Sequence, residues 1–145
     1  MATISATNDA TLTTAFNNAV AGDVIELSDA QFSKLSLSGK DYGAGISVVS
    51  ADVANKARLL GMALSSCVGI SFANIELPYT KSGGDVETTI HIDALNSDNI
   101  NFDYCDIVGA DDPATSSGTG VGIYVNASTN CDITNCLLSG FFLGS

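Results

Sequence analysis

Hydrophobic residues recur with a helical period near the start of the chain, between residues 9 and 21. The positions i, i+3, i+4, i+7 and i+8 are occupied by Leu12, Ala15, Phe16, Ala19 and Val20. One apolar stripe along one side of a helix produces this spacing. Asn8 or Asp9 supplies an N-cap, and Gly22 marks the end of the helix. With a short strand over residues 3–5, the pattern predicts an N-terminal cap over residues 1–22.

From Asp23 onward, apolar residues alternate with polar ones in short runs. These runs cover residues 24–27, 35–37, 46–48, 60–62, 70–72, 90–92, 100–102, 123–125 and 133–135. Alternation of this kind predicts half-buried strands. Strands this short and this closely spaced also occur in sandwiches and barrels, so the alternation alone leaves the architecture open.

An internal repeat favours one architecture. Residues 60–70 align with residues 90–100 and 123–133, so that successive units begin at Leu60, Ile90 and Ile123. In each unit an aliphatic strand is followed by a second one across a polar turn. A third apolar run completes the unit, with Ile75 and Leu77, then Cys105 and Ile107, then Cys136 and Leu138. Three strands per unit predict one coil of a parallel β-helix.

Stacked coils bring equivalent positions about 4.8 Å apart. The alignment therefore predicts aliphatic ladders that join Ile90 to Ile123 and Ile100 to Ile133. The expected fold is all-β: a right-handed parallel β-helix over residues 23–145 with a short N-terminal capping α-helix.

The two ends of the predicted solenoid differ. The helix would cover the unpaired edge of the first coil, which otherwise invites aggregation. Residues 140–145 form an apolar run without a capping element, whereas the terminal repeats of a solenoid normally present a polar face. We therefore expect the β-helix to continue beyond residue 145 or its end to be covered by a partner.

Composition and charge narrow the classes of partner. The net charge is −11, and only 14% of the residues are charged, against about 25% in typical domains. The five basic residues end at Lys81, and nine acidic residues follow it. Phosphate binding needs clustered Lys or Arg, so nucleic acids and anionic membranes are excluded as expected partners. No secretory signal is visible, and no run approaches the roughly 18 apolar residues of a membrane span.

The four cysteines lack the paired spacing of a zinc site. They are Cys67, Cys105, Cys131 and Cys136, and each lies in or beside a strand-like run. We expect reduced thiols that pack as small hydrophobic side chains.

Three stretches carry a resemblance to a known superfamily. Residues 11–27 (TLTTAFNNAVAGDVIEL) resemble the N-terminal cap of pectate-lyase-like β-helix proteins, and residues 47–52 and 131–140 are similar to coils of that superfamily. The resemblance concerns the scaffold. It implies a relation to polysaccharide lyases, glycoside hydrolases, epimerases, adhesins and bacteriophage tailspikes or tail fibres, among which the fold alone does not choose.

The residues that the enzymes of this superfamily use have no counterpart in the later coils. A lyase needs a basic residue as its base, and residues 82–145 contain no Lys or Arg. Hydrolases of this fold carry an acidic pair with a His and a basic residue on later coils; Asp111 and Asp112 are adjacent, but those companions are missing. We therefore assign no catalytic residue, and this stretch favours a non-enzymatic role.

Binding residues are expected on two long loops and on one outward face. The loops over residues 78–85 and 109–120 follow the third strand of successive coils and project from the same side. Four loop carboxylates are candidate calcium ligands: Asp85, Glu87, Asp111 and Asp112. His91 is expected to point outward and to stack on Tyr124, which makes an aromatic face that suits a sugar ring.

Two functions remain open. The first is a virion or extracellular-surface module, such as a phage tail fibre, tailspike or decoration protein, that takes part in assembly or in recognition of a glycan on a host surface. Its partners would be other virion or surface proteins, and members of this kind form homo-oligomers, often trimers. The alternative is the N-terminal part of a polysaccharide lyase or glycoside hydrolase whose active site lies on later coils.

Overall fold

The computed structural model describes residues 1–28, 30–79, 90–109 and 121–140, and these residues are mostly β-strand with one α-helix. The helix is α1 (Asp9–Asn18). The strands are β1 (Thr3–Ala6), β2 (Val24–Leu27), β3 (Gln31–Phe32), β4 (Leu35–Ser38), β5 (Asp41–Ser50), β6 (Arg58–Leu59), β7 (Met62–Ser65), β8 (Val68–Ala73), β9 (Glu76–Pro78), β10 (Ile90–Leu95), β11 (Asp98–Asp103), β12 (Asp106–Val108), β13 (Val121–Asn126), β14 (Asp132–Thr134) and β15 (Leu137–Ser139).

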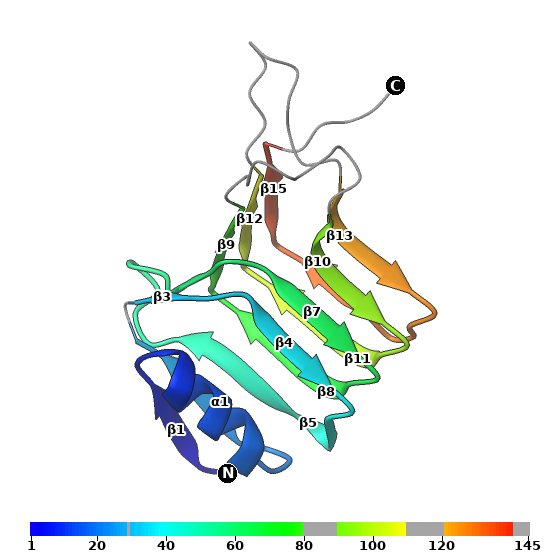
Figure 1. Ribbon diagram of the computed structural model, residues 1–145. Helices are drawn as coiled ribbons and strands as arrows, with labels where there is room; N and C mark the ends of the chain where they lie inside the picture. Colours follow the sequence, from blue (N-terminus) through cyan, green and yellow to red (C-terminus); the bar gives the residue numbers. More distant parts are fainter. Residues whose placement is uncertain (29, 80–89, 110–120, 141–145) are drawn as a thin grey trace.

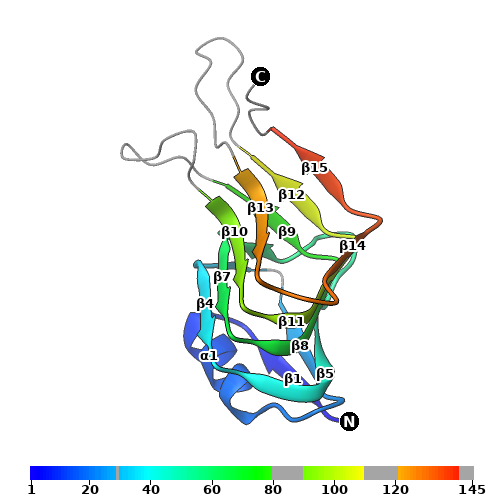
Figure 2. The same cartoon turned by 90° about the vertical axis from the view of Figure 1, so that its right-hand side faces the viewer.

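The strands form three sheets, which we name A, B and C. Sheet A has the order β1-β2-β5-β8-β11-β14, sheet B the order β3-β6-β9-β12-β15, and sheet C the order β4-β7-β10-β13. All the strand pairs are parallel, as the arrows in Figures 1 and 2 show. From β2 onward the chain visits the sheets in the rotation A, B, C, so each strand from β5 onward pairs with the strand three places earlier. We call one such passage a circuit.

The register of the circuits corrects one part of the sequence alignment. Met62 pairs with Ile92, and Ile92 in turn pairs with Ile123. The predicted ladders of Ile90 with Ile123 and of Ile100 with Ile133 are wrong, because Ile123 pairs with Ile92 and Ile133 pairs with Phe102. An error of two positions keeps each side chain on its own face, so the alternation pattern does not detect it.

Corner residues between the strands explain this register. Ser66, Asn96 and Ala127 all have positive φ, between 49° and 54°, at the corner that leads from sheet C to sheet A. A second set with positive φ lies at the corner from sheet A to sheet B and consists of Asn74, Tyr104 and Asn135. Asparagine adopts this left-handed conformation more easily than most residues. Because each circuit turns at equivalent residues, these corners determine which positions of neighbouring strands align.

Inward-facing apolar side chains fill the space that the three sheets enclose. Phe72 of β8 and Phe102 of β11 are stacked with ring centroids 5.3 Å apart, and both are buried. Cys67 and Cys105 are also fully buried, whereas Cys131 and Cys136 are half-buried, and all four thiols are free. The two buried thiols therefore behave as small core hydrophobes.

Helix α1 lies at the end of the stack where the chain begins and packs against β1 and β2 (Figure 1). Asn8 is the N-cap, and its side chain accepts a hydrogen bond from the Thr11 N–H. Leu12 and Phe16 are buried as expected, but Val20 is 64% exposed. The expected stripe is wrong at Val20 because the helix ends at Asn18, which leaves Val20 outside its periodicity.

We expect Phe102→Ala to lower the free energy of unfolding by about 3–5 kcal/mol, because the change removes a stacked, buried ring and leaves a cavity. Denaturant unfolding monitored by circular dichroism measures this change. Tyr104→Asn is the matched control, since Tyr104 is 55% exposed and Asn suits its positive φ; it should change the value by less than about 0.5 kcal/mol. A loss below about 1 kcal/mol for Phe102→Ala would contradict the described packing.

Candidate binding face on sheet C

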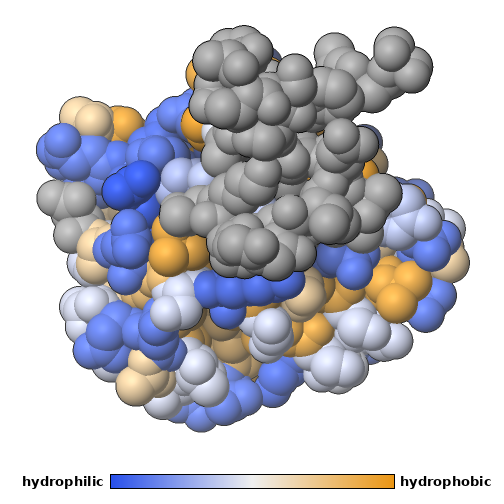
Figure 3. Space-filling model, turned by 45° about the horizontal axis from the view of Figure 1, so that its top comes forward, coloured by the Kyte–Doolittle hydropathy of each residue, from blue (hydrophilic) through white to orange (hydrophobic). Residues whose placement is uncertain are grey.

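The outer face of sheet C brings together the side chains with the clearest potential for ligand binding. On β10, Ile92 and Ala94 are buried in the core, so His91 and Asp93 project from the opposite face. Asp93 lies between Ala63 of β7 and Tyr124 of β13. In Figure 3 the described surface on this side of the molecule combines hydrophilic and apolar residues.

His91 is packed against this face and is only 2% exposed. Its Nε2 donates a hydrogen bond to the carbonyl oxygen of Leu77 at 2.9 Å, and its ring meets the ring of Tyr79 edge to face at a centroid distance of 5.4 Å. A Cβ atom on Gly61 would lie 3.3 Å from His91 Nδ1, so the glycine makes room for the imidazole. The expectation of an exposed His91 is wrong because Tyr79 and Gly61 allow the ring to lie against the sheet.

Burial lowers the pKa of His91 below its usual value of 6.5. The positive charge of Lys34 lowers this pKa further, while the hydrogen bond to Leu77 acts in the opposite direction. At neutral pH the imidazole is therefore uncharged and fixes the position of β10 relative to the end of β9. It is a positioning residue for this face.

Asp93 has a carboxylate oxygen that is both buried and unsatisfied. Within the described part of the chain, its Oδ1 has no hydrogen-bond partner. A buried polar atom without a partner costs about 1–3 kcal/mol, so proteins rarely keep one without a function. The side chain as a whole is half-buried, so the carboxylate lies at the surface while Oδ1 itself is shielded from solvent.

Tyr124 is the neighbour of Asp93 and not of His91. It pairs with Asp93 across β13 and β10, and 42% of its surface is exposed. The expected stack of His91 on Tyr124 is therefore wrong. The same register instead places an exposed aromatic ring beside the unsatisfied carboxylate.

The two segments expected to be long loops follow two strands of sheet B in the chain and precede two strands of sheet C. One leaves after β9 and returns at β10; the other leaves after β12 and returns at β13. The ends are joined, since the Tyr79 N–H donates to the Val108 carbonyl at 2.7 Å. The expected calcium ligands Asp85, Glu87, Asp111 and Asp112 lie outside the described residues, and those residues that are described hold no cluster of His, Cys, Asp or Glu suited to a metal.

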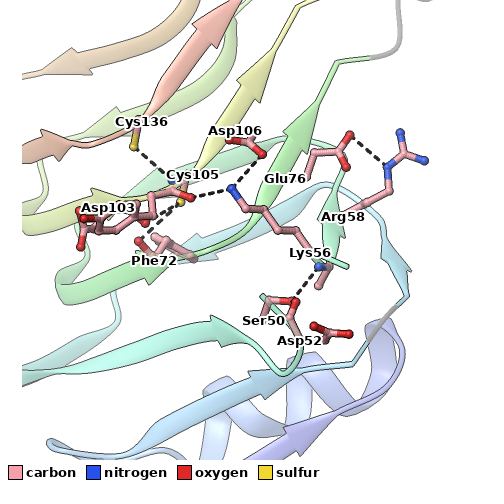
Figure 4. Close-up of polar contacts among 12 residues, drawn as sticks. Ser50, Asp52, Lys56, Arg58, Phe72, Glu76, Asp103, Cys105, Asp106 and Cys136 are labelled. Atoms are coloured by element: carbon pink, nitrogen blue, oxygen red, sulfur yellow. Dashed lines mark hydrogen bonds and ion pairs between the residues drawn. The ribbon is translucent and has the colours of Figure 1, made fainter. Parts of the chain in front are cut away.

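A second polar group, on the outside of sheet B, is satisfied by its own contacts (Figure 4). Lys56 Nζ lies 2.8 Å from Asp106 Oδ2 and donates to the Tyr104 carbonyl at 2.9 Å. Arg58 pairs with Glu76 at 3.4 Å. The Arg58 pair links successive circuits and the Lys56 pair spans two circuits, so we interpret this group as structural.

Sequence reasoning found His91 and Tyr124 but missed Asp93 and Tyr79. The alignment that began its units at Ile90 and Ile123 matched Asp93 to Asn126, whereas the partner of Asp93 in the sheet is Tyr124. The third apolar run carried the correct signal, because Leu77, Ile107 and Leu138 pair with one another in register. Applying the spacing of that run to β10 and β13 would have placed Asp93 beside Tyr124.

Comparisons with known proteins add no relative: no family model matches the chain, and neither the curated proteins nor the solved structures contain a match. The helix in the described ranges is too short to cross a membrane. The physical arrangement of the face is therefore the basis for a functional proposal.

Lowering the pH through about 6.5 should reduce the free energy of unfolding, because His91 binds a proton more readily in the unfolded chain than in the folded one. The contribution of neutral His91 to the free energy of unfolding is fully present above pH 6.5, and it is lost as the pH falls towards the pKa of His91 in the folded protein. In His91→Gln, whose side-chain amide can still donate to Leu77, this dependence should disappear. Urea unfolding at pH 8 and pH 5.5 measures this pH dependence. An equal decrease in the free energy of unfolding of the unmodified protein and of His91→Gln would contradict the assignment to His91.

Proposed function

We propose that the chain forms coils of a right-handed parallel β-helix of the pectate-lyase-like kind and serves as a virion or cell-surface module that recognises a glycan. The rotation through three parallel sheets supports the β-helix, as do the left-handed corner residues that repeat from circuit to circuit. Helix α1, packed against β1 and β2 where the first circuit begins, supports its role as a cap.

The observation that carries glycan recognition is the pairing of Tyr124 with Asp93 on the outer face of sheet C. The C–H groups of a sugar ring pack on an aromatic ring, and sugar hydroxyls donate hydrogen bonds to carboxylate oxygens. Tyr124 supplies an exposed ring, and Asp93 supplies an oxygen that lacks a partner within the described chain. A neutral glycan fits this face better than an anionic one, because the net charge of the protein is −11.

The far end of the stack supports an assembly role. Ile133, Leu137 and Leu138 are 43%, 56% and 49% exposed. By contrast, Phe102 and Ile107, the partners of Ile133 and Leu138 one circuit earlier, are buried. We propose that these side chains and the outer edges of β13, β14 and β15 are covered by a further coil of the β-helix, by other virion or surface proteins, or by further copies of this chain, with a trimer as the expected homo-oligomer.

Glycan binding is tested by titrating neutral polysaccharide fragments of bacterial surfaces into the ¹⁵N-labelled protein and following amide shifts. We expect shifts at β10 and β13, and a loss of affinity of about tenfold or more in both Tyr124→Ala and Asp93→Asn. Tyr104→Asn removes another exposed ring, 55% against 42% for Tyr124, from a corner between sheets A and B and should leave binding unchanged.

Binding that survives both substitutions, or no binding to any fragment, would contradict the proposal. Cleavage of a bound fragment would instead favour the alternative of a polysaccharide lyase or glycoside hydrolase.

Asp93→Ala should leave the free energy of unfolding unchanged or raise it by about 1 kcal/mol, because it removes a buried carboxylate oxygen that has no partner in the described part of the chain. A residue that is retained for ligand binding lowers the stability of the free protein, whereas a residue that is retained for structure raises it. Thermal unfolding measures the difference. A decrease of more than about 1 kcal/mol would assign Asp93 to the structure and not to ligand binding.

A further inference from the structure

Strand β4 is the edge strand of sheet C, and a groove separates it from helix α1. The groove has a volume of 350 Å³, within the range of about 300–1,000 Å³ typical of ligand sites. Its helical wall carries Asp9, Thr13 and Asn17, and Ser36 and Ser38 of β4 lie on the other wall. In Figure 2 the helix lies beside β4 at the end of the sheet.

Contacts at both ends hold the helix alongside the strand. The Ser33 N–H donates to Asp9 Oδ1 at 2.8 Å, and Lys40 Nζ donates to Asn17 Oδ1 at 2.8 Å. Between these contacts, Leu12 and Phe16 of the helix line the groove with Leu35 and Leu37. The groove is therefore a fixed feature that runs along the strand.

The backbone of β4 offers unpaired hydrogen-bonding groups to this groove. The N–H groups of Leu35 and Gly39 donate to Gly61 and Ser65, on the β7 side. In a parallel pair alternate residues bond to the same neighbour, so the N–H and C=O groups of Ser36 and Ser38 face away from β7. Among the described strands β4 has no second neighbour, so these groups face the groove.

The charge around the groove is opposite to that of the whole protein. Lys34 and Lys40, two of the five basic residues, line it, and Asp9 is the acidic residue that does so. Outside the groove the chain has 15 acidic residues and three basic ones, since the whole chain has 16 and five. An extended ligand with negative charges therefore gains attraction here that it would not find elsewhere.

We propose that the groove between α1 and β4 binds an extended acidic peptide segment of a partner protein, which adds to sheet C as a strand beside β4. Its backbone pairs with Ser36 and Ser38, its apolar side chains contact the half-buried Leu37, and its carboxylates lie near Lys34 and Lys40. Addition of a strand to a free sheet edge is an established mode of peptide recognition. The proposal is independent of glycan binding, which depends on Asp93 and Tyr124.

The experiment uses a fluorescein-labelled peptide of alternating glutamate and valine, about eight residues long. Fluorescence anisotropy should detect binding that Thr13→Tyr weakens by about tenfold or more, because the larger side chain fills the groove. Thr14→Tyr is the matched control. Both threonines are exposed and donate to a carbonyl four residues earlier, but only Thr13 lines this groove.

Hydrogen exchange supplies a second readout. In the free protein the amides of Ser36 and Ser38 should exchange quickly, whereas Gly39, bonded to Ser65, exchanges slowly. The peptide should protect Ser36 and Ser38 and leave Gly39 unchanged. The same peptide with N-methyl groups on alternate residues should not bind, since it cannot form the strand pairing.

Three outcomes would overturn the proposal. Equal binding to Thr13→Tyr and Thr14→Tyr would place the peptide elsewhere. Equal binding of the N-methylated peptide, or of an acidic oligosaccharide, would exclude strand pairing as the mode of recognition. Slow exchange of Ser36 and Ser38 without peptide would mean that the strand edge is already occupied.

Discussion

Parallel pairing between strands from successive circuits is the interaction on which the rest of this structure depends. A strand in this arrangement has no partner nearby in sequence, because its neighbour lies about one circuit away, as with Met62 and Ile92. The pairing satisfies the backbone and places apolar side chains such as Phe72 and Phe102 over one another. Each circuit therefore gains stability only from the circuits on either side of it.

The same strand pairing determines which side chains lie next to one another on the outer faces of the sheets. Once Ile92 is directed into the core, His91 and Asp93 project outward, and the register chooses their neighbours. His91 then becomes buried against Tyr79 and Gly61, while Asp93 lies beside the exposed Tyr124. The proposed glycan face is thus a product of register, since a shift of one residue would bury Asp93 and expose the core.

The distribution of charge separates structural from binding surfaces. Lys56 and Arg58 are used in ion pairs with Asp106 of β12 and Glu76 of β9, on the later strands of sheet B. Lys34 and Lys40 instead line the groove beside α1. In a chain with five basic residues, this location gives one end of the molecule an electrostatic character different from the acidic remainder.

The sequence by itself determined the helix, most of the strands and their faces, but it did not show β3 or β6, and the strand expected over residues 60–62 begins only at Met62. The apolar spacing predicted α1, and the alternation predicted strands that include Ile70–Phe72 and Ile100–Phe102, because both signals depend on local periodicity. Only the tertiary structure decided which residues became neighbours. Alternation has a period of two and cannot distinguish Ile90 from Ile92 as the partner of Ile123, whereas the positions of the left-handed corners do. The burial of His91 and the pairing of Asp93 with Tyr124 follow from that choice.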